Sequence, residues 1–110
     1  MHGDDGNVQP TAGATALGLA KRSGMSVVCG HTHRMGLSHY TQAWSRGSRA
    51  VWGMEVGHLM DVKHAKYIKA GLFTWQQGFG ILHVDGKNVT PQIVPIIKNS
   101  FTVEGKTWRW

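Results

Sequence analysis

The feature that most constrains the fold is a helix that leads directly into a short apolar strand. The helix is expected from Thr11, as the N-cap, to about Ser23, because apolar residues recur at helical spacing and Gly24 suits a left-handed C-cap. The strand follows at once over Met25–Cys29. A strand that is apolar throughout is typical of a sheet covered on both faces. The junction therefore predicts an α/β unit, whose strand needs parallel neighbours on both sides.

The rest of the chain carries hairpin signals, and no second helix-to-strand unit supplies those neighbours. Strand pairs are expected at Leu37–Trp44 with Arg49–Glu55, at Phe79–Val84 with Val89–Ile97 around Asp85-Gly86, and in a final small hairpin around Glu104-Gly105. Pro91 and Pro95 cannot donate ladder hydrogen bonds, so their strand should lie at an edge or at bulges. Val56–Ala70 is ambiguous, and its segment Met60–Ala70 can form a short surface helix. The predicted fold class is α/β (α+β by content), with one helix and mostly antiparallel strands.

Length and composition fit one domain over residues 1-110. With 110 residues and 41% hydrophobic content, the chain can bury most of the apolar surface that it exposes when unfolded. Cys29 is the only cysteine, which excludes an intrachain disulfide and indicates a small buried side chain at the end of its strand. No apolar run approaches the ~20 residues of a bilayer span. We therefore expect no membrane association and a cytoplasmic location.

The charge is compatible with polyanionic partners. The formal net charge is +6 and the sequence pI is about 9.9, which favours nucleic acid or phosphorylated molecules. The basic residues are scattered, and their densest groups have the size of ordinary solvated faces. Charge by itself therefore selects no function.

A histidine-rich loop, GHTHRMG, follows the apolar strand. In an extended or irregular loop, residues two positions apart project to the same side, so His31 and His33 can present ring nitrogens to one ion or to two adjacent ions, while Thr32 points away. Neutral imidazoles suit Zn, Mn, Fe, Co or Ni, and their affinity depends on pH. Incidental histidines are the alternative interpretation of this spacing. Arg34, directly after the histidines, is a candidate for a bidentate phosphate contact or an ordinary surface arginine.

Together with His2-Gly3 upstream, the GHTH loop resembles the last two metal-binding blocks of the calcineurin-like metallophosphoesterases. WGMEVG (Trp52 to Gly57) and TWQQGFGILHVDG (Thr74 to Gly86) look like bacteriophage members of that family. The resemblance implies the C-terminal half of a metallophosphoesterase β-sandwich, and a bacterial host cell as the location. It also implies divalent ions, Mn or Zn, Fe or Ni, with His2 and His31 serving the second metal and His33 the first. The implied activity is metal-dependent hydrolysis of phosphomonoesters or phosphodiesters.

The chain departs from the family in lacking its Asp-x-His, Gly-Asp-x-x-Asp and Gly-Asn-His blocks. These blocks supply the bridging carboxylate, an amide ligand and a histidine thought to assist the leaving group. Imidazoles without carboxylates leave the metal charge unbalanced, so metal should be weakly bound or absent. We expect impaired or no activity from the isolated chain. A homo-oligomer, or a partner chain that carries the missing half, is expected to accompany it.

The remaining histidines and tryptophans leave a second function open. His83 is interpreted as a hydrogen-bonded sheet residue, His64 as part of a solvated face, and His58 as structural, with a place at the rim of the site as its alternative. Trp52 and Trp75 are expected in the core. Exposed tryptophans on a basic chain can instead stack on nucleic-acid bases. The alternative function is thus a non-catalytic basic module that oligomerises or binds nucleic acid.

Overall fold

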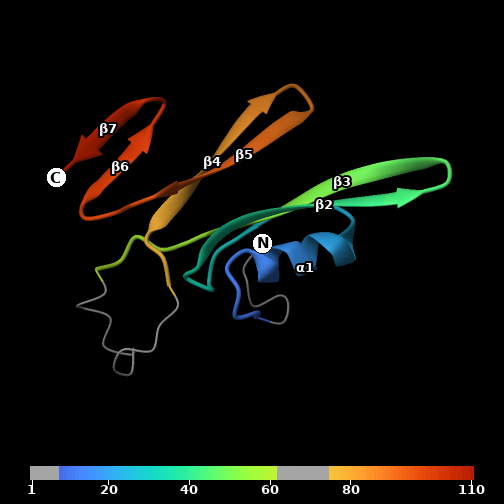
Figure 1. Ribbon diagram of the computed structural model, residues 1–110, viewed down its shortest axis with the longest axis horizontal. Coiled ribbons are helices and arrows are strands. Elements are labelled where there is room, and N and C mark those ends of the chain that lie inside the picture. The colour runs from blue at the N-terminus through green and yellow to red at the C-terminus, as the bar shows by residue number, and fades with distance from the viewer. Residues whose placement is uncertain (1–7, 62–74) are drawn as a thin grey trace.

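The computed structural model describes residues 8–61 and 75–110. Along these residues the order is α1 (Ala14–Ser23), β1 (Val27–Cys29), β2 (Met35–Trp44), β3 (Gly47–Val56), β4 (Gly78–Asp85), β5 (Asn88–Pro95), β6 (Ser100–Val103) and β7 (Lys106–Arg109) (Figure 1). The strands form one sheet of order β1-β3-β2 and two hairpins, β4-β5 and β6-β7. In residues 8–61 and 75–110 the fold is α+β in content, with one helix and mainly antiparallel pairing, as predicted.

The helix α1 ends where the sequence predicts but begins later. Its C-cap is Gly24, which has φ 71° and donates its backbone N–H to the Ala20 carbonyl at 2.9 Å. The N-cap is Gly13, with φ 85° and no side-chain cap, so the prediction of Thr11 as N-cap is wrong. The reason is a close approach between backbones. A Cβ on Gly36 of β2 would lie 2.7 Å from the Gly13 nitrogen, and the left-handed glycine turns the chain past this strand.

Strand β1 finds its parallel neighbour in β3, the second strand of the β2-β3 hairpin. Val27 pairs with Gly53 and Cys29 with Glu55, in parallel register. Among the described strands β3 is the one neighbour of β1, which lies at the edge of the β1-β3-β2 sheet. The predicted need for parallel neighbours on both sides is therefore wrong, because a ten-residue hairpin strand on one side pairs with β1. The strand is also shorter than predicted and begins at Val27, while Met25 is exposed.

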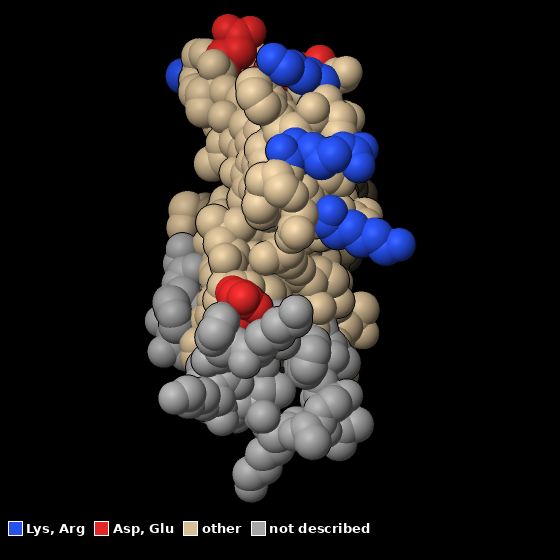
Figure 2. Space-filling view, turned by 90° about the vertical axis from the view of Figure 1, so that its left-hand side faces the viewer, with Lys and Arg blue, Asp and Glu red and all other residues tan. Residues whose placement is uncertain are grey.

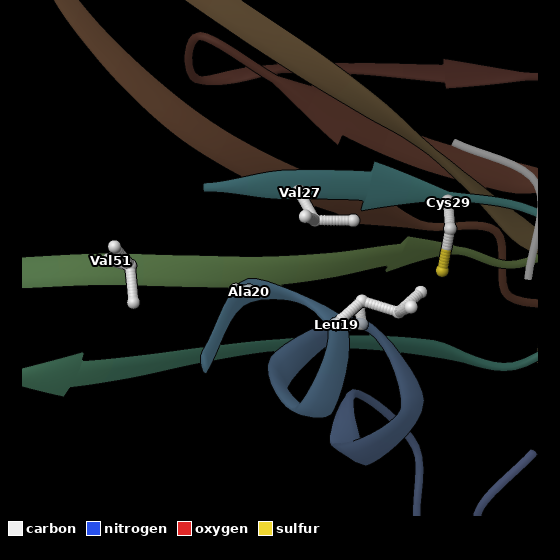
Figure 3. Close-up of a cluster of buried hydrophobic side chains, with 6 residues drawn as sticks. Leu19, Ala20, Val27, Cys29 and Val51 are labelled. Atoms are coloured by element: carbon white, nitrogen blue, oxygen red, sulfur yellow. The ribbon is translucent and has the colours of Figure 1, made fainter. Parts of the chain in front are cut away.

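The helix packs on one face of the β1-β3-β2 sheet and forms the core. The buried cluster consists of Ala16, Leu19, Ala20, Val27, Cys29 and Val51 (Figure 3). Gly53 allows the contact, because a Cβ there would overlap the backbone of Ala16 and Leu17. Cys29 is buried, as predicted. The helix thus lies directly on the central strand β3.

The β4-β5 hairpin lies against the other face of the sheet. Successive residues of a strand point to opposite faces, and Met54, next to Gly53, points away from α1. A Cβ on Gly80 of β4 would come within 2.8 Å of the Met54 Cε atom. Pro91 and Pro95 both lie in β5, which pairs only with β4 among the described strands and so confirms the predicted edge position. The arrangement is a helix, a sheet and a second, two-stranded sheet in layers.

The final hairpin, β6-β7, turns at the predicted Glu104-Gly105 and extends the second layer. Its Phe101 ring packs edge-on against Phe79 of β4, with ring centroids 5.3 Å apart. Most of Met60–Ala70, where a short helix was possible, lies outside the described residues. None of the helices in the described segments is long and apolar enough to span a membrane.

We expect Gly53→Ala to lower the free energy of unfolding by about 2 kcal/mol or more, because the added methyl group must push α1 off β3. Gly18→Ala is the matched control, since it lies in α1 with no atom within 4 Å of an added Cβ. That variant should raise stability by about 0.5 to 1 kcal/mol. Urea unfolding followed by circular dichroism measures both, and equal effects would contradict the close packing.

Candidate functional site

The carboxyl ends of β1 and β3 lie side by side, because the two strands run parallel. The histidine loop follows β1, and Gly57 and His58 follow β3. The edge at which parallel strands end is where α/β folds commonly build their ligand sites. Backbone pairing alone therefore brings segments 25 residues apart in sequence into one place.

The loop is anchored from inside by Thr32. Thr32 is buried, and its hydroxyl donates a hydrogen bond to Oε1 of Glu55 at 2.5 Å. Glu55 is fully buried, and its Oε2 atom has no hydrogen-bond partner within the described part of the protein. The Thr32 side chain therefore points into the protein. The loop is thus fixed by a hydrogen bond between two buried side chains, where water competes little.

The two flanking histidines do not have extended backbone. His31 has φ 72° and His33 has φ 56°, both left-handed conformations that cost energy for a residue with a side chain. Of the two loop forms expected from the sequence, extended or irregular, the described backbone is therefore the irregular one. His31 is exposed, whereas His33 is half-buried and turned toward other parts of the chain.

Gln76 ties the histidine loop to the end of β3. Its backbone N–H donates to the His33 carbonyl at 3.0 Å, and its carbonyl accepts from the His58 N–H at 3.2 Å. Its side-chain oxygen accepts from the Met35 N–H at 2.8 Å. Gly57 allows this closeness, since it has φ 76° and a Cβ there would lie 2.7 Å from the Gln76 carbonyl oxygen. One glutamine therefore holds three segments together.

His33, His58 and Trp75 form a ring cluster at this junction. The His33 and Trp75 rings meet edge-on with centroids 4.3 Å apart, and the His33 and His58 centroids are 6.0 Å apart. The Nδ1 atoms of both histidines are buried and have no hydrogen-bond partner among the described residues. Such unpartnered buried atoms are uncommon in folded proteins.

Burial favours the neutral form of both imidazoles. It lowers the pKa of His33, with smaller contributions from His58 and His31. It also lowers the pKa of His58, opposed by a hydrogen bond with the Met60 backbone. The neutral ring is the form that binds metal ions. Burial also raises the pKa of the Cys29 thiol to about 11, helped by the nearby Glu55 carboxyl group, which makes this cysteine an inert one.

The other predicted site residues are spread around this cluster. His2 and His64 lie outside the described residues. The Arg34 guanidinium donates to the Gln9 carbonyl at 2.7 Å. His83, on β4, bonds Gln92 at 2.8 Å, as expected for a sheet histidine. Within residues 8–61 and 75–110, no three His, Cys, Asp or Glu side chains are grouped closely enough to hold a metal ion.

Sequence reasoning missed Glu55 and Gln76, and it placed His58 and Trp75 mainly in structural roles. A carboxylate inside the apolar run AVWGMEV was a usable signal for Glu55, because a buried carboxyl group needs a partner. Nothing local marked Gln76, whose role depends on contacts with segments 18 or more positions away. In the described residues His33 therefore lies beside His58, a neighbour that the prediction of His31 and His33 as ligands did not include.

Comparison with known proteins gives relatives from bacteriophages. The chain is 43% identical over 109 residues to the Gene 54 protein of Mycobacterium phage D29, and 42% identical over 109 residues to that of Mycobacterium phage L5. Each match covers 97% of this chain but 43% of the relative, so the chain spans less than half the length of these relatives. No family model and no solved structure matches it. The phage character of the sequence is therefore supported, as the resemblance predicted.

We expect Thr32→Val to lower the free energy of unfolding by about 2 kcal/mol, because it leaves the buried Glu55 Oε1 atom without its donor. Thr32→Ser keeps the hydroxyl group and should cost about half as much, through the lost methyl group alone. Thermal and urea unfolding of the two variants provide the comparison. A valine variant as stable as the serine variant would show that the hydrogen bond does not hold the loop.

Proposed function

We propose that this chain is a metallophosphoesterase-like protein of the bacteriophage calcineurin-like type, corresponding to the C-terminal half of that sandwich. The observation that carries the proposal is the GHTH loop at the carboxyl end of a buried parallel strand, where His33 offers a neutral imidazole with an unpartnered Nδ1 atom. The family function is hydrolysis of phosphomonoesters or phosphodiesters. A phosphate ester is accordingly the proposed substrate.

The donor set fits a divalent metal ion in part. Neutral imidazoles bind Mn, Zn, Fe or Ni, and the proposed ligands are His2, His31 and His33. Within the described residues, the carboxylate at the end of β3, Glu55, is buried and bonded to Thr32, so it does not face an ion at the histidine loop. We therefore propose weak metal binding by the chain alone.

A bound divalent ion lowers the pKa of a water ligand and neutralises phosphoryl oxygens. The chain's own residues fix the position of the loop that would hold the ion. The bond between Thr32 and Glu55 fixes the loop, and the Trp75 ring keeps water from one side of His33. Arg34 directly follows His33, and a guanidinium there suits two oxygens of a phosphate group.

The proposed partners follow from the length of the relatives. More than half of each Gene 54 protein has no counterpart in this chain. We propose that activity is impaired or lost without that part, and that a partner chain carrying it restores activity. A homo-oligomer is the proposed state of the chain by itself, without restored activity, because every copy lacks the same part. The cytoplasm of the bacterial host is the proposed location.

A basic, non-catalytic module is the second candidate. Lys and Arg side chains follow one another along one side of the surface in Figure 2. Trp108, on β7, is 48% exposed, and Trp110, at the end of the chain, is 64% exposed. The Lys106 Nζ atom lies 4.0 Å from the centre of the Trp108 ring. An exposed aromatic ring beside a cation suits stacking on nucleic-acid bases. Metal-independent, salt-sensitive binding of single-stranded DNA would favour this candidate.

The deciding experiment is Mn-dependent hydrolysis of bis-p-nitrophenyl phosphate by the purified chain and by the complete Gene 54 protein of phage D29. We expect turnover by the complete protein, a small fraction of it from the chain, and a gain when the chain is mixed with the rest of the relative. His33→Ala should abolish what activity the chain has, whereas His39→Ala, on exposed β2, should leave it unchanged.

Two results would contradict the proposal. Turnover by the chain equal to that of the complete relative would show that the missing blocks are unnecessary. No turnover by either protein, with metal present, would remove the hydrolytic function and favour the basic module.

A further inference from the structure

His58 shares a buried junction with His33, although nothing in the metallophosphoesterase resemblance assigns it a ligand role. His58 is 8% exposed, and its Nδ1 atom has no hydrogen-bond partner within the described residues. The same holds for the Nδ1 atom of His33. A buried nitrogen without a partner carries a desolvation cost, which a bound ion would remove.

The spacing of the two rings suits one shared ion. Transition metals lie about 2.0–2.1 Å from a coordinating imidazole nitrogen, which places the centroids of two rings on one ion about 5 to 6 Å apart. The His33 and His58 centroids are 6.0 Å apart, with an interplanar angle of 63°. The separation of the two rings therefore matches that of two imidazoles on one ion.

The backbone around both histidines is held before any ion arrives. The His33 carbonyl and the His58 N–H both bond to the backbone of Gln76, and the Gly57 N–H donates to the Arg34 carbonyl at 2.8 Å. A hydrogen bond between the His58 ring and the Met60 backbone further orients that ring, as the outer partners of metal-bound histidines commonly do. The pair is thus preorganised, and binding requires little ordering of the chain.

From this geometry we propose that His33 and His58 bind one transition-metal ion, of the Zn or Co type, through their Nδ1 atoms, beside the Trp75 ring. Imidazole pairs select such ions over Mg and Ca, which prefer oxygen ligands. Water or a third protein donor completes the coordination. The proposal shares His33 with the proposed hydrolytic site but needs no hydrolysis.

The test is a Co²⁺ titration of the full chain, followed by visible absorption, with Zn²⁺ competition to give affinities. We expect His33→Gln and His58→Gln each to weaken binding at least tenfold and to change the cobalt spectrum. His39→Gln, an exposed histidine on β2, is the matched control and should bind as the unaltered chain does. Circular dichroism checks that each glutamine variant is folded.

A second measurement on the unaltered chain covers the case in which a variant fails to fold. Zn²⁺ should shift the Nδ1 resonances of two histidines in a long-range nitrogen-15 spectrum. Unchanged Nδ1 resonances would overturn the proposal. A folded His58→Gln variant that binds Co²⁺ as tightly as the unaltered chain would also overturn it. If His33→Gln weakens binding in the same experiment, the proposed hydrolytic site is still supported, because that site uses His33 and not His58.

Discussion

The parallel pairing of β1 with β3 is the constraint on which the rest of the structure depends. It sets Cys29 beside Glu55 and makes both strands end at one edge. Without it, the histidine loop and His58 would belong to separate parts of the chain. Gly53, the partner of Val27 in this pairing, lets α1 approach β3 closely and cover the sheet at this point. A missing side chain in the middle of a strand thus supports the arrangement of the functional edge.

Buried polar contacts turn this shared edge into a defined site. The hydrogen bond from Thr32 to Glu55 ties the histidine loop to β3. Gln76 forms backbone hydrogen bonds with both segments that carry the histidines. These contacts hold His31 and His33 in left-handed conformations that would otherwise be unfavourable. The unfavourable backbone conformations are thus accompanied by a fixed position of the imidazole nitrogens, and a fixed position is what the proposed metal ligands require.

The sequence predicted features that depend on neighbouring residues and missed those that depend on distant ones. The end of α1 at Gly24 and the edge position of a strand with two prolines follow from local backbone chemistry. The start of α1 at Gly13 depends on the approach of β2, and the residues of β3 that pair with β1 lie 26 positions further along the chain. For the same reason the histidine loop could be recognised from the sequence. The contact between His33 and His58 could not, because it joins two segments that only the fold brings together.

The metal site that we propose lies where the carboxyl ends of β1 and β3 meet. Anomalous diffraction at the cobalt absorption edge, from crystals of this chain grown with Co²⁺, tests this proposal most directly. We expect an anomalous peak at the ends of these two strands, within bonding distance of His33. Cobalt bound only at exposed histidines such as His39, or no ordered cobalt in well-diffracting crystals, would contradict it.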